Sequence, residues 1–195
     1  MKWIIRVLAL RIAKLLPLNL FKNIVGLIVL AKHFPEIKKS PYFNRKEDLW
    51  SFIINKENKD KVLFLEFGVH KGRSIKKIAS FNTHPESKFI GFDSFEGLPE
   101  DWRNFVKFYK KNHFDTGGKM PDTNDKRIQF VKGWYNLTLP KFLKEFDAKP
   151  FNKIIIHLDS DIYSSTLYCL ILLSQYFPQM NIIFDELPGE EGKST

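Results

Sequence analysis

The sequence alternates between short apolar runs and segments with helical periodicity. Apolar runs with the composition of buried strands cover residues 61–67, 88–92, 128–132, 153–158 and 181–184. Segments that favour helices cover residues 44–58, 74–80, 139–145 and 164–176. Near-continuous apolar strands that alternate with helices are typical of a parallel sheet covered on both faces. The pattern therefore predicts an α/β fold with a mostly parallel sheet.

Carboxylates stand at the carboxyl ends of four of these predicted strands. They are Glu66, Asp93, Asp159 and Asp185. Ligands of open α/β sheets collect beyond the carboxyl ends of the strands. Because charged side chains are poor choices for a core, we expect these four to converge on one crevice.

The first 58 residues differ from the rest of the chain. Basic residues at positions 2, 6, 11 and 14 fall on one half of a helix, and apolar residues fill the other half. The uncharged run 23–31 is much shorter than the roughly 20 residues of a membrane-spanning helix. We favour an N-terminal helical pair that covers the sheet or forms a dimer contact. The alternative is peripheral membrane contact through residues 1–31. We assign residues 1–58 to N-terminal amphipathic helices and 59–195 to a ligand-binding domain, together one compact unit.

The amino-acid composition limits which binding partners and which cellular compartment we expect for the chain. Cys169 is the only cysteine, so the chain forms neither an intrachain disulfide nor a cysteine-based metal cluster. The formal net charge is +9, but the lysines are spread along the chain and no nucleic-acid-binding motif is recognised. We therefore expect a cytoplasmic protein that does not bind nucleic acid, with a membrane-peripheral location as the alternative.

The turn after the first strand has the spacing E-x-G-x-x-x-G, from Glu66 through Gly68 to Gly72, before a helix near Ser74. The dinucleotide turn G-x-G-x-x-G has another spacing. The spacing found here matches S-adenosylmethionine enzymes, in which the acidic residue meets the amino-acid end of the ligand. His70 would line this site. An ordinary strand-to-helix turn remains an alternative.

The second acidic position strengthens the ligand hypothesis. Asp93 ends the second strand, where a carboxylate can accept hydrogen bonds from both ribose hydroxyls. NAD enzymes use the same arrangement, so Asp93 indicates an adenosine ribose rather than a methyl donor. The alternative is a turn or helix-capping aspartate.

Five ordered segments carry a more specific resemblance: LEFGVHKGRSI, IGFDSFEGLPEDW, FVKGWYNLTLP, IHLDSDIYSSTLY and IIFDE. Over about residues 60–187 the chain resembles the macrocin O-methyltransferase family, class I S-adenosylmethionine-dependent enzymes that methylate sugar hydroxyls. The resemblance implies a Rossmann-like class I methyltransferase sheet. It also implies the following cofactor contacts: Glu66, Gly68 and Ser74 near the methionine part, Asp93 on the ribose, and Ser94, Gly133 and Trp134 near the adenine.

The resemblance further implies one Mg²⁺ held by Asp159, Asp185 and Glu186. Such an ion would bind vicinal hydroxyls of the acceptor and lower the pKa of the one to be methylated. Glu186 stands where Asp or Asn is more usual. His113, in the long insertion 94–126, is our candidate for the general base, whereas His157 has the position of a core histidine. Asp161 could be a further ligand, but we favour a helix cap.

The sequence thus predicts an S-adenosylmethionine-dependent O-methyltransferase of a sugar or other small hydroxyl compound, in natural-product or glycan biosynthesis. Class I methyltransferases continue after the fifth strand with a helix and an antiparallel strand pair, whereas residues 188–195 have the composition of a polar tail. We therefore expect a truncated C-terminal end, for which the N-terminal helices or a second subunit of a homo-oligomer would compensate. The alternatives are a non-catalytic ligand-binding or scaffold protein with this fold, and an NAD-dependent oxidoreductase.

Overall fold

The computed structural model describes residues 28–29, 31–54, 60–103 and 108–185. The chain divides into two compact units: one comprises residues 1–42 with 186–195, and the other residues 43–185. The amphipathic helix predicted over the first residues and the metal ligand Glu186 lie outside the described residues. In the first unit, the structure describes a short 3-10 helix, η1 (Pro35–Lys39). Among the described residues, no helix combines the length and apolar character that crossing a membrane requires.

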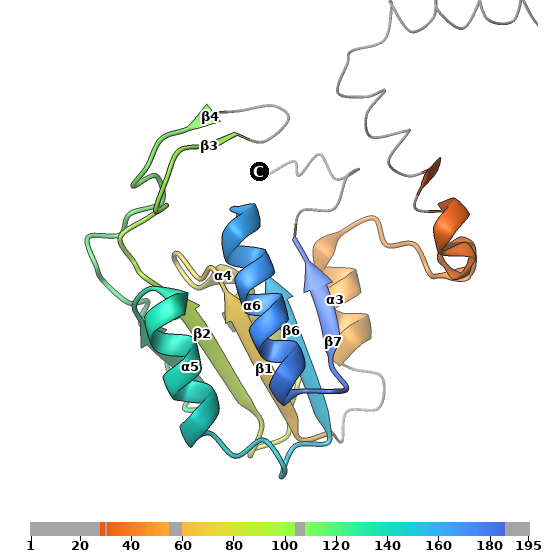
Figure 1. Cartoon of the computed structure of the whole chain (residues 1–195). Coiled ribbons are helices and arrows are strands. Elements are labelled where there is room, and N and C mark those ends of the chain that lie inside the picture. The colour runs from red at the N-terminus through yellow and green to blue at the C-terminus, as the bar shows by residue number, and fades with distance from the viewer. Residues whose placement is uncertain (1–27, 30, 55–59, 104–107, 186–195) are drawn as a thin grey trace, which may run out of the picture. The chain divides into compact units, whose positions relative to one another are not determined.

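A five-stranded parallel sheet forms the centre of the second unit (Figure 1). Its strands, in chain order, are β1 (Val62–Phe67), β2 (Lys88–Asp93), β5 (Ile128–Lys132), β6 (Lys153–Leu158) and β7 (Asn181–Phe184). They lie in the spatial order β5-β2-β1-β6-β7. The chain reverses direction across the sheet between β1 and β6, which is the switch point where α/β folds bind ligands. The predicted parallel α/β fold is confirmed.

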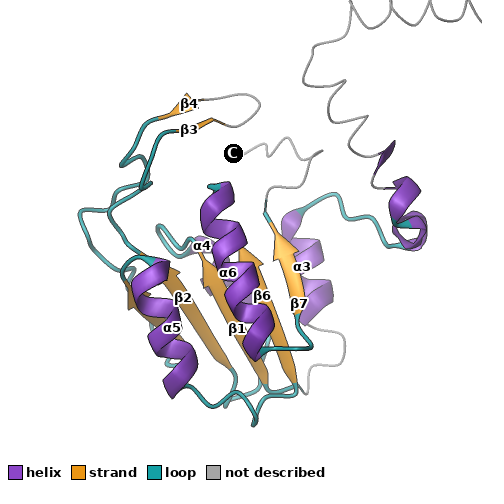
Figure 2. Ribbon diagram, viewed as in Figure 1, coloured by secondary structure: helices purple, strands orange, loops and turns teal. Residues whose placement is uncertain are grey.

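Helices cover both faces of this sheet (Figure 2). The helices are α3 (Lys46–Ile54), α4 (Arg73–Ser80), α5 (Tyr135–Glu145) and α6 (Tyr163–Tyr176). Alternate residues of β1 point to opposite faces. Phe64 packs with the buried residues of α3 and α4, and Leu65 packs with those of α5 and α6. Since Glu66 is two residues after Phe64, its side chain points to the α3 and α4 face.

Two local features differ from the sequence-based prediction. Helix α5 begins at Tyr135 rather than 139, because the Trp134 carbonyl oxygen already accepts the first helical hydrogen bonds, from Leu137 N and Thr138 N. Buried Leu139 and Leu143 hold the helix on the sheet, and Pro140 lies within it. The insertion that follows β2 contains an antiparallel hairpin of two-residue strands, β3 (Trp102–Arg103) and β4 (Phe108–Tyr109). Strands this short give no periodic signal in the sequence.

Candidate ligand-binding site

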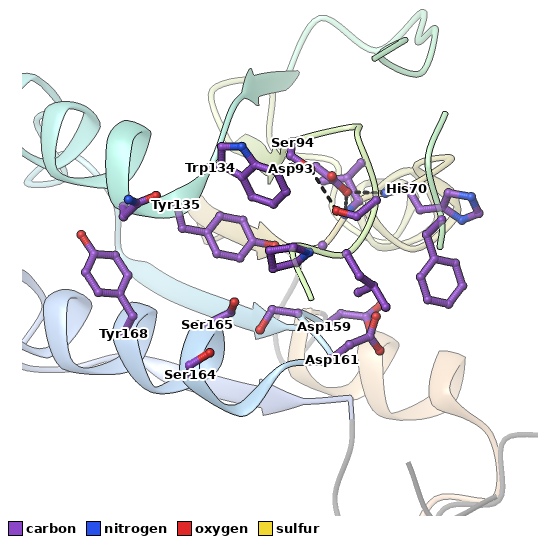
Figure 3. Close-up of a pocket in the computed structure, with 18 residues that line it drawn as sticks. His70, Asp93, Ser94, Trp134, Tyr135, Asp159, Asp161, Ser164, Ser165 and Tyr168 are labelled. Atoms are coloured by element: carbon purple, nitrogen blue, oxygen red, sulfur yellow. Dashed lines mark hydrogen bonds between the residues drawn. The ribbon is translucent and has the colours of Figure 1, made fainter. Parts of the chain in front are cut away.

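A cavity of about 460 Å³ opens at the carboxyl edge of the sheet (Figure 3). Segments that follow β1, β2, β5 and β6 all contribute to its wall. The lining residues are Gly68, Val69, His70, Asp93, Ser94, Gly97, Leu98, Pro99, Phe114, Trp134, Tyr135, Asn136, Asp159, Ser160, Asp161, Ser164, Ser165 and Tyr168. The cavity therefore lies where the sheet topology predicts a ligand.

Gly68 allows the ends of β1 and β6 to approach each other closely. Its φ is +96°, and a Cβ atom placed there would lie 1.8 Å from the carbonyl oxygen of Asp159. The backbone N–H of Gly68 donates to Phe92 O at 3.0 Å, and that of Asp159 donates to Phe67 O at 2.9 Å. The glycine is thus required by the packing of two strand ends that form the floor of the cavity.

The Asp93 carboxylate holds the glycine turn in place. Its Oδ2 accepts hydrogen bonds from the backbone N–H groups of Val69 and His70, each at 2.8 Å, and its Oδ1 accepts one from Phe95 at 2.7 Å. An ionised carboxylate offers about four acceptor positions. Asp93 therefore has a structural role, and about one acceptor position, on Oδ1, remains for the predicted ligand contact.

An Asp93→Asn variant should loosen this turn. The asparagine NH₂ group would face backbone N–H groups that now donate to a carboxylate, so we expect the free energy of unfolding to fall by about 1–3 kcal/mol. Amide hydrogen exchange at Val69 and His70 should accelerate. The control is Asp115→Asn, because Asp115 accepts a bond from Gly117 N in an exposed turn. Equal losses in both variants would contradict the structural role of Asp93.

Aromatic residues after β5 form another wall of the cavity. Gly133, with φ +138°, ends the strand, and Trp134 caps α5 through its carbonyl oxygen, which accepts from Leu137 N and Thr138 N. Burial and the nearby carboxylates raise the pKa of the Tyr135 phenol well above 10. At neutral pH this hydroxyl therefore stays protonated and can donate a hydrogen bond.

A buried ionic cluster lies next to Asp159. The Nδ1 of His157 is 2.9 Å from Glu66 Oε1, and its Nε2 is 3.6 Å from Asp185 Oδ1. The Nζ of Lys46 lies 2.7 Å from both oxygens of Asp185. Glu66 and His157 are register partners in neighbouring strands, and both side chains are fully buried.

The environment of this cluster changes the protonation of its members. Burial alone would lower the pKa of His157, but the carboxylates of Asp185 and Glu66 outweigh burial and raise that pKa to about 10. Burial opposes ionisation of Asp185 as well, yet His157 and Lys46 lower its pKa to about 2. Burial, and then the charge of Asp185, raise the pKa of Asp159. At neutral pH the cluster therefore holds a protonated His157 imidazole and an ionised Asp185 carboxylate.

We tested whether the described residues could hold a divalent cation. Ligand atoms of His157, Asp159 and Asp185 lie within 4.8 Å of one another. His157 Nε2 and Glu66 Oε2 are buried without a hydrogen-bond partner among the described residues. A protonated imidazole has no free lone pair, so the two aspartates are the donors available to a hard cation. These two carboxylates fit such an ion, which would share the Asp185 carboxylate with Lys46.

The structure brings together part of the site predicted from the sequence. The predicted residues that line the cavity are Gly68, His70, Asp93, Ser94, Trp134 and Asp159. Those that do not line it are Glu66, Gly72, Ser74, Gly133, His113 and Asp185. The expectation that four strand-end carboxylates share one crevice is therefore corrected, because Glu66 and Asp185 belong to the neighbouring ionic cluster.

His113 and Asp161 are placed differently from our expectation. The His113 ring packs against Tyr109 and Phe114, at centroid distances of 4.7 and 4.4 Å, on an exposed part of the insertion. Its role as a base stays a prediction. The residue at the cap position of α6 is Ile162, one position after Asp161, and the Ile162 side chain makes no cap hydrogen bond. Asp161 lines the cavity instead, with φ +58°.

Sequence reasoning missed Tyr135, Tyr168 and Phe114 as cavity residues. Tyr135 is the second residue after the glycine that ends β5, so its position next to a strand end was an available signal. Tyr168 lies one turn into α6, and Phe114 belongs to the insertion. Nothing in their local sequence distinguishes these two from core aromatics.

No protein-family model and no curated protein sequence matches the chain. Among solved structures, the fold is similar to the crystal structure of the calicheamicin methyltransferase CalS11, with a TM-score of 0.52 and 20% identity over 73% of this chain. An apo structure of CalS11, described as a TDP-rhamnose 3'-O-methyltransferase, matches with a TM-score of 0.47 and 20% identity over 73% of this chain. The chain spans 63% and 62% of these two structures.

The fold is therefore the Rossmann-like fold found in methyltransferases. Within that class, the similarity to CalS11 is a similarity of fold. The finer resemblance to macrocin O-methyltransferases stays a prediction.

Proposed function

We propose that this chain binds S-adenosylmethionine in the cavity and acts as a methyltransferase. The observation that carries the proposal is the glycine turn after β1, which Asp93 holds in place and which lines, together with Trp134, a cavity at the switch point of the sheet. An adenosine needs a ribose-binding carboxylate and an apolar wall for its base. Asp93 and Trp134 have the chemistry for these two contacts.

We further propose O-methylation of a small hydroxyl compound, with a sugar or glycoside as acceptor. The support is the sequence resemblance to macrocin O-methyltransferases together with the similarity of fold to CalS11, a calicheamicin methyltransferase. In such a transfer the acceptor oxygen attacks the methyl carbon in line, the bond from that carbon to the sulfonium sulfur breaks to leave the thioether S-adenosylhomocysteine, and the acceptor proton passes to a base. Rate acceleration comes mostly from holding the two reactants against each other.

Asp159 and Asp185 are the residues that would hold a Mg²⁺ ion beside the cavity. When bound, such an ion polarises an acceptor hydroxyl as a Lewis acid. Asp159 lines the cavity, which supports a role in orienting the acceptor, whereas Asp185 does not line it. Tyr135 also lines the cavity, and its protonated phenol is a hydrogen-bond donor that can fix the orientation of a bound ligand.

Calorimetric titration with S-adenosylhomocysteine tests the cofactor proposal. We expect micromolar binding by the full chain. Trp134→Ala should weaken that binding by about five- to 150-fold, because stacking of a base on an aromatic ring contributes about 1–3 kcal/mol. The matched control is Tyr163→Ala, which removes a ring that is 78% exposed and does not line the cavity.

Three results would contradict the proposal. One is the absence of binding by a sample that melts cooperatively. Another is displacement of S-adenosylhomocysteine by NADH at similar concentrations, which would favour an oxidoreductase. The third is equal weakening by the Trp134 and Tyr163 variants, which would place the ligand outside the cavity.

A further inference from the structure

Lys46 connects the first helix of the second unit to the carboxylate that ends β7. Its Nζ lies 2.7 Å from Oδ1 and 2.7 Å from Oδ2 of Asp185, which is 139 residues away in the sequence. Helix α3 is fixed on the sheet by buried Trp50 and Ile54. The lysine therefore reaches Asp185 from an anchored helix.

The Lys46 ammonium binds the Asp185 carboxylate, which a divalent cation at this site would need as a ligand. Asp185 and Asp159 are the oxygen donors next to the cavity, and both Asp185 oxygens contact Lys46. A cation bound to Asp185 would lie within a few ångströms of the ammonium group, where two positive charges repel each other strongly. Lys46 and the cation would also compete for the same lone pairs.

The Lys46 side chain can give up this contact. It is 37% exposed, whereas Asp185 is 17% exposed. The flexible stem of a lysine allows its charged end to move into water while the carboxylate stays in place. Site occupancy can therefore exchange between the ammonium and an external cation without unfolding of α3.

We infer that Lys46 sets the divalent-cation affinity of the Asp159 and Asp185 pair by competing with the cation for Asp185. This inference rests on the metal part of the proposed function. The cation then occupies the site only at concentrations high enough to displace the Lys46 ammonium from Asp185. A lysine that served only to attach α3 would stabilise the protein without opposing the cation.

The test is titration of the full chain with Mn²⁺, followed by electron paramagnetic resonance of the free ion, in the absence of cofactor and acceptor. Lys46→Met should bind Mn²⁺ at least about tenfold more tightly than the unmodified protein, because one competing charge is removed. Lys46→Arg keeps the charge and should differ by less than about threefold. Displacement of bound Mn²⁺ by Mg²⁺ should give the same order of cation affinity among the variants.

Two further variants serve as controls. Lys61→Met removes a lysine whose Nζ pairs with Glu86 at 3.1 Å at the other end of the sheet, and it should leave Mn²⁺ affinity unchanged. Adding Asp185→Asn to Lys46→Met should abolish the gain. If the methionine variant does not fold, Lys46→Gln retains a hydrogen-bond donor for Asp185 and should show tighter binding as well.

Unchanged or weaker Mn²⁺ binding by Lys46→Met and Lys46→Gln would overturn the inference. So would the absence of saturable binding by every variant. Titration of the same samples with S-adenosylhomocysteine separates the two proposals. If the protein binds S-adenosylhomocysteine but the Lys46 substitutions do not change its Mn²⁺ affinity, only this inference is wrong. If the folded protein does not bind S-adenosylhomocysteine, the methyltransferase proposal is wrong.

Discussion

One added methyl group at Gly68 should lower the free energy of unfolding by about 3–5 kcal/mol, the sum of overpacking and backbone strain. The Cβ atom of Gly68→Ala would lie 1.8 Å from the carbonyl oxygen and 2.7 Å from the carbonyl carbon of Asp159. Both atoms belong to the backbone, so no side-chain rotation relieves the clash. The φ of +96° adds strain for any residue with a Cβ atom.

Urea denaturation of Gly68→Ala and Gly117→Ala measures this effect. Gly117 also has a positive φ, +65°, but a Cβ atom there would meet nothing within 4 Å. The control therefore contains the backbone strain without the clash, and it should lose only about 1 kcal/mol. Similar midpoints for the two variants would show that the ends of β1 and β6 separate easily. In that case the floor of the cavity would not depend on this glycine.

The strands were predictable because each is a local and almost continuous apolar run. The runs at 128–132, 153–158 and 181–184 coincide with β5, β6 and β7. Their parallel pairing also follows from the intervening helices. For the same reason the sequence assigns Asp93, the last residue of β2, and Asp159, which follows β6, to a common cavity, and both line it.

The ionic cluster was not predictable from the sequence because it depends on register and on distant segments. Glu66 meets His157 only because β1 and β6 pair with these residues side by side. A shift of the register by one residue would place the two side chains on opposite faces of the sheet. Lys46 precedes β1 by a whole helix, so nothing local links it to Asp185. The sequence therefore indicated a core histidine at 157 without its partners.

His157→Leu should lower the free energy of unfolding by about 3–5 kcal/mol, because it leaves the buried Glu66 carboxylate without its cation. The Glu66 oxygen Oε1 is 2.9 Å from the imidazole, and Oε2 has no hydrogen-bond partner among the described residues. The double variant Glu66→Leu and His157→Leu should be more stable than His157→Leu alone. His113→Leu, at an exposed histidine, should change stability by less than about 0.5 kcal/mol. A double variant that loses the sum of both single losses would show that the pair does not interact.

The same pair predicts how stability depends on pH, measured in EDTA to remove metal ions. The pKa of His157 is about 10 in the folded protein and about 6.5 in the unfolded chain. A raised pKa in the folded state contributes stability that is complete below pH 6.5 and is lost as the pH rises toward 10. The stability difference between the unmodified protein and His157→Leu should therefore narrow by about 1.4 kcal/mol per pH unit between pH 7 and pH 9. Using this difference cancels the titration of lysines and tyrosines that both proteins share. A difference that stays constant over this range would mean that the buried imidazole is neutral, and that its Nε2 lone pair faces Asp185 as a possible metal ligand.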